Sequence, residues 1–401
     1  MEVIVQKYGG TAVETVEKVQ KIANGIIQRK KEGYSIVVVV SAMGKTTNRL
    51  IELANSVSAK PDKRELDMLM ATGEQVSVSI LSMVLKEKGY ESISLTGFQA
   101  GIKTEGTHTK NKIIEIDIER IKNYLEEGKI VVVAGFQGIN GEGDITTLGR
   151  GGSDTTAIAL AAKLKCPCEI YTDVDGIYGV DPRLYPNAKK LDTICFEEMM
   201  EMSSLGAKVL ETRSVEIGYR YNVPIYVASS HMDKKGTYIK EFDKQMEQKV
   251  ITGLTISDDI LMVTINHIPY SPENISNIFS SLSDREVNID MISQTSPNNN
   301  RVNISFTTSK ENETVVDEAL NEQVKKISGI KVKKDSDVSK LSVVGMGMRN
   351  ESGVASKMFK LFAENDIYFK LVTTSEISIS YTINASDKQK AINAISKTFN
   401  L

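Results

Sequence analysis

Apolar and polar positions follow two different periods in the first 250 residues. Short apolar runs rich in Val and Ile alternate with longer stretches in which apolar residues recur every three or four positions. The short runs predict strands at Val3–Lys7, Ile36–Ser41, Ile130–Ala134, Glu169–Thr172 and Pro224–Val227. The longer stretches predict helices, the clearest being Val13–Lys31, Glu65–Lys88 and Asp154–Leu164.

Several of the predicted strands are apolar on both faces, and Ile36–Val40 contains no polar residue. Continuous apolar runs are typical of parallel strands that lie buried between helices. Because the strands alternate with helices, the pattern predicts βαβ units and an α/β domain whose sheet is covered by helices. We place this domain at residues 1–248.

The remainder of the chain contains an internal repeat that follows a charged segment, Lys240–Gln245, interpreted as a connector. Phe279–Thr295 corresponds to Phe359–Ser375 at a spacing of 80 residues. Each copy has an amphipathic helix followed by two strands, which are predicted at Val287–Ser293 and Val302–Thr307, and at Ile367–Thr373 and Ile377–Ile383. We expect two α+β units, at 249–340 and 341–401, which could exchange strands and leave a sheet edge free for partners.

Lys331–Lys334 is a basic cluster between the two copies. A nucleic-acid patch is one reading, but Asp335 and Asp337 follow at once, so a solvated linker is favoured.

Composition narrows the class of protein further. The chain has 401 residues, too many for one ordinary core, and 49 basic against 52 acidic side chains. This balance argues against a binder of nucleic acid or of anionic membranes. No apolar run approaches the roughly 20 residues that span a bilayer, and the start of the chain lacks the features of a signal peptide. Three cysteines, Cys166, Cys168 and Cys195, are interpreted as inert thiols of a cytoplasmic protein.

Glycine-rich loops follow the first two predicted strands. No Walker A loop is present, because Val39 stands where that motif needs its first glycine before Gly44-Lys45-Thr46. Lys7-Tyr8-Gly9-Gly10-Thr11 could instead bring backbone N–H groups and a lysine to a phosphate, although an ordinary turn would look similar. Ser41–Thr47 forms a second loop of small residues at the same edge.

Gly149-Arg150-Gly151-Gly152-Ser153-Asp154 is the most informative stretch. Three glycines surround one arginine, and Ser153 or Asp154 is expected to cap the following helix. Such a loop can hold an anion at a helix N-terminus while Arg150 binds a carboxylate through two hydrogen bonds.

Other polar residues at predicted strand and helix ends remain ambiguous. Asp173 and Asp175 could bind ribose hydroxyls or a hydrated Mg²⁺, and Arg183 a phosphate. Glu74 opens an apolar helix, where it either compensates the helix dipole or binds a substrate ammonium. Lys208 is similarly ambiguous.

These loops resemble the sequence signatures of aspartate kinases. They occur in the same order as in that family, and the similarity extends over nearly the whole chain. The Gly149–Thr156 and Tyr171–Arg183 stretches are the most specific. Asn288–Ile292 and Thr374–Ile377 resemble parts of the paired ACT domains that follow the catalytic domain in that family. The resemblance implies an amino-acid-kinase fold, ferredoxin-like ACT units and transfer of the ATP γ-phosphoryl group to the β-carboxylate of L-aspartate.

The resemblance also implies roles for individual residues. Catalytic roles fall on Lys7, Gly10, Ser41 and Asp154. ATP binding falls on Lys7, Tyr8, Gly9, Gly10, Thr172, Asp173, Tyr178, Arg183 and Lys208. Aspartate binding falls on Thr47, Glu74, Arg150, Gly151, Gly152, Ser153 and Asp154. Mg²⁺ would arrive with the nucleotide and not in a protein site of its own. Lysine or threonine would act as effector at an ACT interface in a homodimer or larger homo-oligomer.

The sequence departs from the family pattern at several positions. Glu211-Thr212-Arg213 replaces His-Pro-Arg, and Ala12 replaces a serine. Tyr270-Ser271-Pro272-Glu273 and Ser352-Gly353 alter the entries to the two ACT copies, so feedback could be weakened or its effector changed. The alternatives are an amino-acid kinase with another acceptor and a non-catalytic amino-acid sensor.

Overall fold

The computed structural model describes residues 2–230, 234–241 and 249–401, and these divide into two compact units. The N-terminal unit comprises Met1–Ile177, Lys190–Ser204 and Lys208–Gln245, and the C-terminal unit comprises Tyr178–Lys189, Leu205–Ala207 and Met246–Leu401. Most of the predicted connector Lys240–Gln245 lies outside the described residues.

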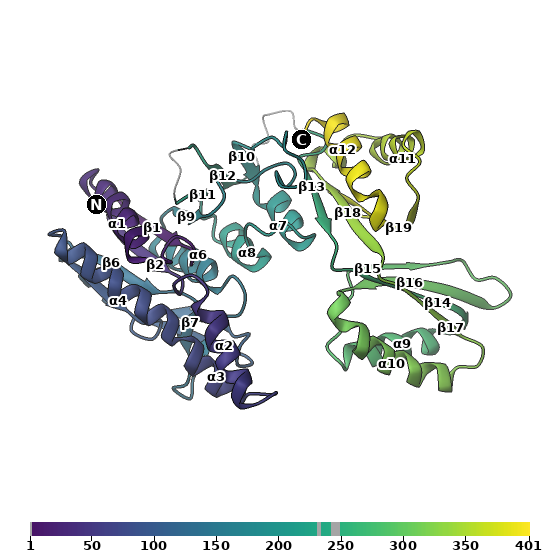
Figure 1. Cartoon of the computed structure of the whole chain (residues 1–401), viewed down its shortest axis with the longest axis horizontal. Helices are drawn as coiled ribbons and strands as arrows, with labels where there is room; N and C mark the ends of the chain where they lie inside the picture. Colours follow the sequence, from purple (N-terminus) through teal and green to yellow (C-terminus); the bar gives the residue numbers. More distant parts are fainter. Residues whose placement is uncertain (1, 231–233, 242–248) are drawn as a thin grey trace. The chain divides into compact units, whose positions relative to one another are not determined.

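An eight-stranded sheet forms the centre of the N-terminal unit, in the order β10-β12-β11-β9-β1-β2-β6-β3 (Figure 1). Its strands are β1 (Val3–Tyr8), β2 (Ser35–Val40), β3 (Ser92–Leu95), β6 (Ile130–Ala134), β9 (Cys168–Thr172), β10 (Thr193–Cys195), β11 (Ile225–Ser229) and β12 (Thr237–Lys240). All neighbouring pairs are parallel except β11 and β12. The chain leaves β1 toward β2, whereas β9 leads toward β11, so the order reverses between β1 and β9. In open α/β sheets, ligands bind at the carboxyl ends of the strands beside such a reversal.

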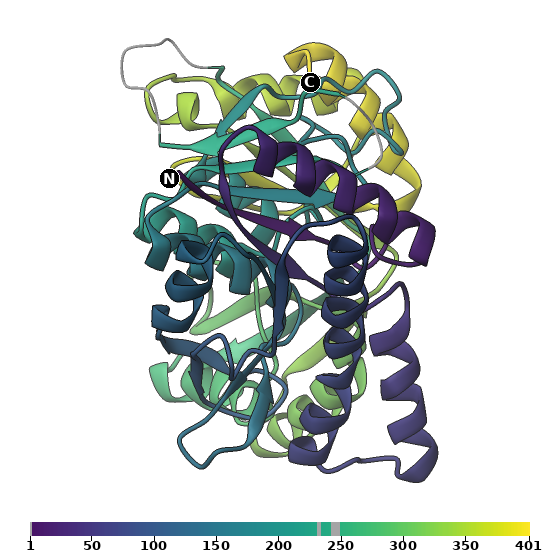
Figure 2. The same cartoon turned by 90° about the vertical axis from the view of Figure 1, so that its left-hand side faces the viewer.

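Helices cover this sheet as the apolar runs predict. α1 (Val16–Lys31) and α4 (Thr72–Glu87) lie on the same face of the sheet (Figure 2). Their apolar side chains pack there against Ile4, Val38 and Val132. The other helices of the unit are α2 (Thr46–Val57), α3 (Lys63–Met70), α5 (Glu119–Glu126), α6 (Gly152–Leu164), α7 (Phe196–Ser204) and α8 (Thr212–Arg220). A second, small sheet contains β4 (Ile102–Glu105), β5 (Lys112–Ile116), β7 (Gln137–Ile139) and β8 (Ile145–Thr147).

Two four-stranded sheets form the C-terminal unit. One, in the order β15-β16-β14-β17, contains β14 (Leu261–Pro269), β15 (Met291–Gln294), β16 (Arg301–Thr308) and β17 (Lys331–Asp335), with helices α9 (Pro272–Ser283) and α10 (Glu313–Lys326). The other, in the order β13-β18-β20-β19, contains β13 (Gly253–Ser257), β18 (Val338–Val344), β19 (Phe369–Thr374) and β20 (Ser378–Asn384), with α11 (Val354–Glu364) and α12 (Lys388–Phe399).

Strand β13 precedes the first of these sheets in sequence but pairs with β18 of the second, where Thr255 lies opposite Ser342. Residues 261–335 are therefore inserted between two parts of the other sheet. The predicted boundaries at 248 and 340 stay predictions.

Three expectations differ from the structure. The helix predicted at Glu65–Lys88 is divided at Ala71 into α3 and α4, and the Ala71 carbonyl there accepts a hydrogen bond from Gln137 Nε2 (2.9 Å). The basic cluster is not a linker: it is edge strand β17, in which Lys334 pairs with carboxylates of α10. Finally, the helical run Lys63–Glu87 is long and apolar enough to cross a membrane by length and composition, although half of its most apolar window is buried inside the protein. The buried core helix of a soluble protein can meet the same criteria of length and composition.

Candidate active site

Strand β1 positions the side chain of Lys7 at the predicted site. Ile4 and Tyr8 of β1 point into the core under α1 and α4, so the alternation of a strand directs Lys7 to the opposite face. There its Nζ lies 2.6 Å from Asp154 Oδ1 of α6, and the side chains are only 9% and 12% exposed. The contact is an ion pair across the carboxyl end of the sheet, beside Gly9.

The backbones of the loops after β1 and β2 lie in close contact at Gly10 and Ala42. A Cβ on Gly10 would lie 2.8 Å from the Ala42 carbonyl oxygen, too close for any larger residue. Gly44 N–H donates to the Gly10 carbonyl (2.9 Å), and Ser41 N–H donates to the Tyr8 carbonyl (3.1 Å). The predicted residues Gly10 and Ser41 therefore lie in neighbouring loops whose backbones fix each other.

Glu74 is buried next to these loops. Its Oε1 accepts the Ala42 N–H (3.0 Å), while Oε2 has no partner in the part of the chain that the structure describes. Gly73 permits this approach, because a Cβ there would lie 2.8 Å from Ala42 Cβ. Burial raises the pKa of Glu74 to about 7, against the opposing effect of the Ala42 N–H. A buried carboxylate whose second oxygen accepts no hydrogen bond can bind a cationic group of a ligand.

Replacing Glu74 by Gln should stabilise the protein, and more at pH 8 than at pH 5. The folded-state pKa lies above the ordinary value of 4.5, so burial of this carboxyl destabilises the fold; the cost grows as the pH rises from about 4.5 to about 7 and is constant above that. We expect a gain of about 1 to 3 kcal/mol in the free energy of unfolding at pH 8, measured by denaturant titration. Glu87→Gln, the same change at an exposed position of α4, is the control and should show no comparable pH dependence. An equal gain for both variants would contradict the expected role of burial.

The glycine-rich loop begins helix α6 differently from the sequence prediction. Gly151, in the left-handed region at φ 66°, is the N-cap, and the helix starts at Gly152. The expected cap at Ser153 or Asp154 is therefore wrong. Because Asp154 lies in the first turn, its carboxylate is available to Lys7.

Arg150 projects from this loop and is exposed. No ion pair holds it among the described residues. The altered residue Glu211 packs directly on the loop: its Cγ occupies space only 2.1 Å from where a Cβ on Gly151 would be.

The residues expected at the nucleotide are only partly brought together. The Tyr8 ring is buried and stacked on Tyr171, with ring centroids 5.0 Å apart, so its backbone alone could reach a ligand. Thr172 donates to Asp173 (3.0 Å) just after β9, at the same edge as Lys7. Lys208 is exposed.

Tyr178 and Arg183 belong to the C-terminal unit. Arg183 pairs with Asp181 there (2.6 Å), and this contact lowers the pKa of Asp181. Asp175, the other candidate carboxylate of the β9 loop, lies near Lys190 and Lys234, at 3.5 and 3.6 Å.

Thr47 lies at the start of α2, whose first residue Thr46 contacts Gly73 beside Glu74. The sequence reasoning missed one buried carboxylate of the same region, Asp67 of α3, because it lies in the middle of an otherwise ordinary helical pattern. Its contacts are described below.

All three cysteines are buried and free, and burial raises the pKa of Cys166 to about 12. This agrees with their interpretation as inert thiols.

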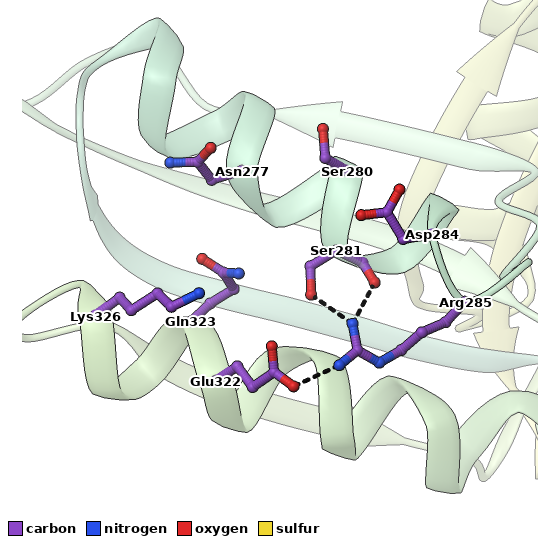
Figure 3. A pocket seen from close by; sticks show the side chains of 8 residues that line it. All are labelled: Asn277, Ser280, Ser281, Asp284, Arg285, Glu322, Gln323 and Lys326. Atoms are coloured by element: carbon purple, nitrogen blue, oxygen red, sulfur yellow. Dashed lines mark hydrogen bonds and ion pairs between the residues drawn. The ribbon is translucent and has the colours of Figure 1, made fainter.

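A polar hollow of about 300 Å³ lies elsewhere, between α9 and α10 of the C-terminal unit (Figure 3). It is lined by Asn277, Ser280, Ser281, Asp284, Arg285, Glu322, Gln323 and Lys326. Arg285 is already occupied, because it donates to the Ser281 carbonyl (3.0 Å) and hydroxyl (3.2 Å) and pairs with Glu322. None of the residues predicted for catalysis lies there.

Comparisons with known proteins show the family of the chain. Residues 2–229 match the amino acid kinase family, and residues 341–399 match an ACT domain. The chain is 46% identical over 404 aligned positions to an aspartokinase of Bacillus sp. (strain MGA3), covering 100% of this chain and 98% of that protein. The chain belongs to the aspartokinases of the amino acid kinase family.

The fold of this aspartokinase chain also matches solved structures. Escherichia coli aspartokinase III in complex with aspartate and ADP superimposes with a TM-score of 0.81 at 22% identity, over 99% of both chains. The same enzyme in complex with lysine and aspartate gives a TM-score of 0.78 at 21% identity, over 100% of both chains. These matches confirm the predicted fold class, an amino-acid-kinase sheet covered by helices and followed by ACT units.

Proposed function

We propose that the protein transfers the γ-phosphoryl group of ATP to the β-carboxylate of L-aspartate, forming 4-phospho-L-aspartate. This reaction is the first step of lysine, threonine and methionine biosynthesis. The observation that carries the proposal is the Lys7–Asp154 ion pair, which places a cation at the carboxyl edge of the sheet, beside the loops of Gly9 and Gly10.

Aspartate binding follows from the charges that the site leaves uncompensated. Glu74 offers a buried carboxylate oxygen to the α-ammonium, and Arg150 offers a planar fork of N–H groups to the α-carboxylate. Thr47 and the segment Gly151–Asp154 complete this half of the site. With both ends of the amino acid held, the β-carboxylate is directed toward the phosphate.

The chemistry needs charge neutralisation and no general base. A carboxylate with a pKa near 4 is already ionised at pH 7, so the nucleophile is ready, but it must meet another anion. Lys7 and the backbone N–H groups of the glycine loops would stabilise the charge that spreads over the equatorial oxygens. Ser41 would help to hold the transferring group.

The nucleotide would lie at the ends of β1 and β9. We expect Thr172, Asp173 and Lys208 to contact it, and the roles of Tyr178 and Arg183, which belong to the C-terminal unit, stay predictions from the resemblance. Mg²⁺ is usually bound by one or two carboxylates together with substrate phosphates, and Asp154 is a carboxylate at this edge that fits such a role. The ion would neutralise phosphate charge when ATP is bound.

The test is the formation of aspartyl hydroxamate from Mg-ATP, L-aspartate and hydroxylamine. Hydroxamate from aspartate, but not from glutamate, is expected. Product from glutamate instead would favour the alternative of a kinase with another acceptor. A folded, ATP-binding protein that forms no hydroxamate would favour a non-catalytic sensor.

We further propose that the ACT region binds lysine or threonine in a homodimer or larger homo-oligomer. The altered entry at Tyr270–Glu273 leaves the helix start intact, because α9 begins at Pro272 and Ser271 accepts the Asn274 N–H (3.5 Å). Gly353 likewise caps α11 at φ 91°.

Lysine or threonine, added singly or together, should therefore lower the rate of hydroxamate formation. Dose-response curves at subsaturating aspartate would measure the effect, with alanine as the control amino acid. A rate that neither effector changes would show that the substitutions have abolished feedback.

A further inference from the structure

Asp67 is a fully buried carboxylate outside the substrate contacts proposed above. It lies in α3, with 0% of its side chain exposed, and the loop between β4 and β5 surrounds it. His108 Nδ1 lies 2.7 Å from Oδ2, and the Thr109 N–H is shared between Oδ1 (3.1 Å) and Oδ2 (3.0 Å). The hydroxyl of Thr147, the last residue of β8, donates to Oδ1. We call Asp67, His108, Thr109 and Thr147 the Asp67 cluster.

The cluster holds its loop in a conformation that the loop would not otherwise favour. Thr109 has φ 74°, in the left-handed region, and a β-branched residue is rare there. Strain of this kind costs on the order of 1–3 kcal/mol and persists only where the surroundings impose it. In this conformation the Thr109 N–H makes a three-centre hydrogen bond to both carboxylate oxygens of Asp67, which helps to hold it.

This loop sets the position of the segment that carries Arg150. The Thr109 carbonyl oxygen lies 3.1 Å from where a Cβ on Gly149 would be, and Gly149 itself has φ 78°. Arg213 joins the same two segments, because its guanidinium donates to the Asn111 carbonyl (2.9 Å) and to the Leu148 carbonyl (3.2 Å). The loop is thus held against the two residues that directly precede Arg150.

The cluster also connects Arg150 with Glu74. Asp67 is one turn before Ala71, at which α3 gives way to α4, and Glu74 lies in the first turn of α4. Gln137 Nε2 fixes this junction through the Ala71 carbonyl (2.9 Å). Helix α3 therefore links the two binding groups: its Asp67 contacts the loop that packs on the segment before Arg150, and its end joins α4, which carries Glu74.

We propose that Asp67 is a positioning residue that fixes the separation between Arg150 and Glu74 and so determines the affinity for aspartate. The inference rests on the proposed function, in which these two residues bind the α-carboxylate and the α-ammonium. Asp67 does not itself contact substrate. Substitution of Asp67 should therefore raise the KM for aspartate and leave the KM for ATP nearly unchanged.

Asp67→Asn is the first variant, because Asn keeps the shape but has one acceptor oxygen and no charge. We expect the aspartate KM to rise about tenfold or more, since small misplacements of binding groups are costly, while the ATP KM stays within about twofold. Amide hydrogen exchange of residues 107–111 and 148–152 should become faster.

Thr147→Val and Thr147→Ser form a milder pair in case Asp67→Asn folds poorly. Val removes the hydroxyl that donates to Asp67, and Ser restores it, so the aspartate KM should rise in the first and return toward wild type in the second. Asp62→Asn is the matched control: Asp62 also accepts hydrogen bonds from α3, from the N–H groups of Arg64 (3.0 Å) and Glu65 (3.1 Å), but it caps the start of the helix, at the end remote from Ala71, and Asn can cap a helix as well. It should leave both KM values unchanged.

The outcomes separate this inference from the proposed function. An unchanged aspartate KM with unchanged exchange in Asp67→Asn overturns the inference, as does an equal rise of the aspartate and ATP KM values or an equal rise of the aspartate KM in the Asp62→Asn control. Wild-type protein that forms no aspartyl hydroxamate overturns the proposed function, and the exchange data then still decide whether Asp67 holds the loops.

Discussion

Lys7→Ala should lower kcat for aspartate phosphorylation by about 100-fold or more, with a smaller change in the aspartate KM. Loss of one preorganised charge donor at a transition state typically has this effect. Lys7 is well suited to the role, because its strand is central to the sheet and its side chain is 91% shielded from solvent beside Gly9. Initial rates of hydroxamate formation at saturating Mg-ATP would measure kcat.

Two controls accompany this variant. Lys31→Ala removes an exposed lysine at the end of α1, away from the carboxyl edge of the sheet, and should leave kcat unchanged. Because Lys7→Ala leaves Asp154 buried without its partner, circular dichroism must show that the variant is folded. A folded Lys7→Ala protein with near-normal kcat would remove Lys7 from the mechanism.

Arg150→Lys should raise the aspartate KM by about tenfold or more. An ammonium keeps the charge of the side chain but lacks the planar fork that binds a carboxylate through two hydrogen bonds. Steady-state kinetics with aspartate varied at saturating Mg-ATP would measure the effect, and the ATP KM should change little.

Arg120→Lys is the matched control, since Arg120 is an exposed arginine of α5, which leads into the opposite end of β6. It should behave as wild type. An Arg150→Lys enzyme with an unchanged aspartate KM would show that the α-carboxylate is bound elsewhere.

The strands of the central sheet could be predicted from the sequence because continuous apolar runs are stable only when both of their faces are buried. Ile130–Ala134 was placed without error, since five consecutive small or β-branched apolar residues can only be buried on both faces. The break at Ala71 could not be predicted, because alanine is the best helix former and the apolar pattern continues across it. β17 was missed for a different reason: its lysines satisfy an edge strand only once Glu313 and Asp317 of α10 lie beside them.

The candidate site shows the same limit. Glycine and charge patterns singled out Arg150 but left Lys7 and Glu74 ambiguous, and only the resemblance to aspartate kinases assigned roles to all three. The pairing of Lys7 with Asp154 required the three-dimensional fold. Asp67 gave no signal, since a single aspartate within a helix is usually exposed, and only its 0% exposure reveals a different role.

The place of β13 has a consequence for the order of events during synthesis. The strand Gly253–Ser257 leaves the ribosome long before Lys340–Val344, with which it pairs. During that interval its hydrogen-bonding groups have no final partner, while residues 261–335 can already close their own sheet. The C-terminal unit should thus fold in a set order: the inserted sheet forms first and brings the two flanking segments together. A chain interrupted near residue 340 would retain one finished sheet and one orphaned strand.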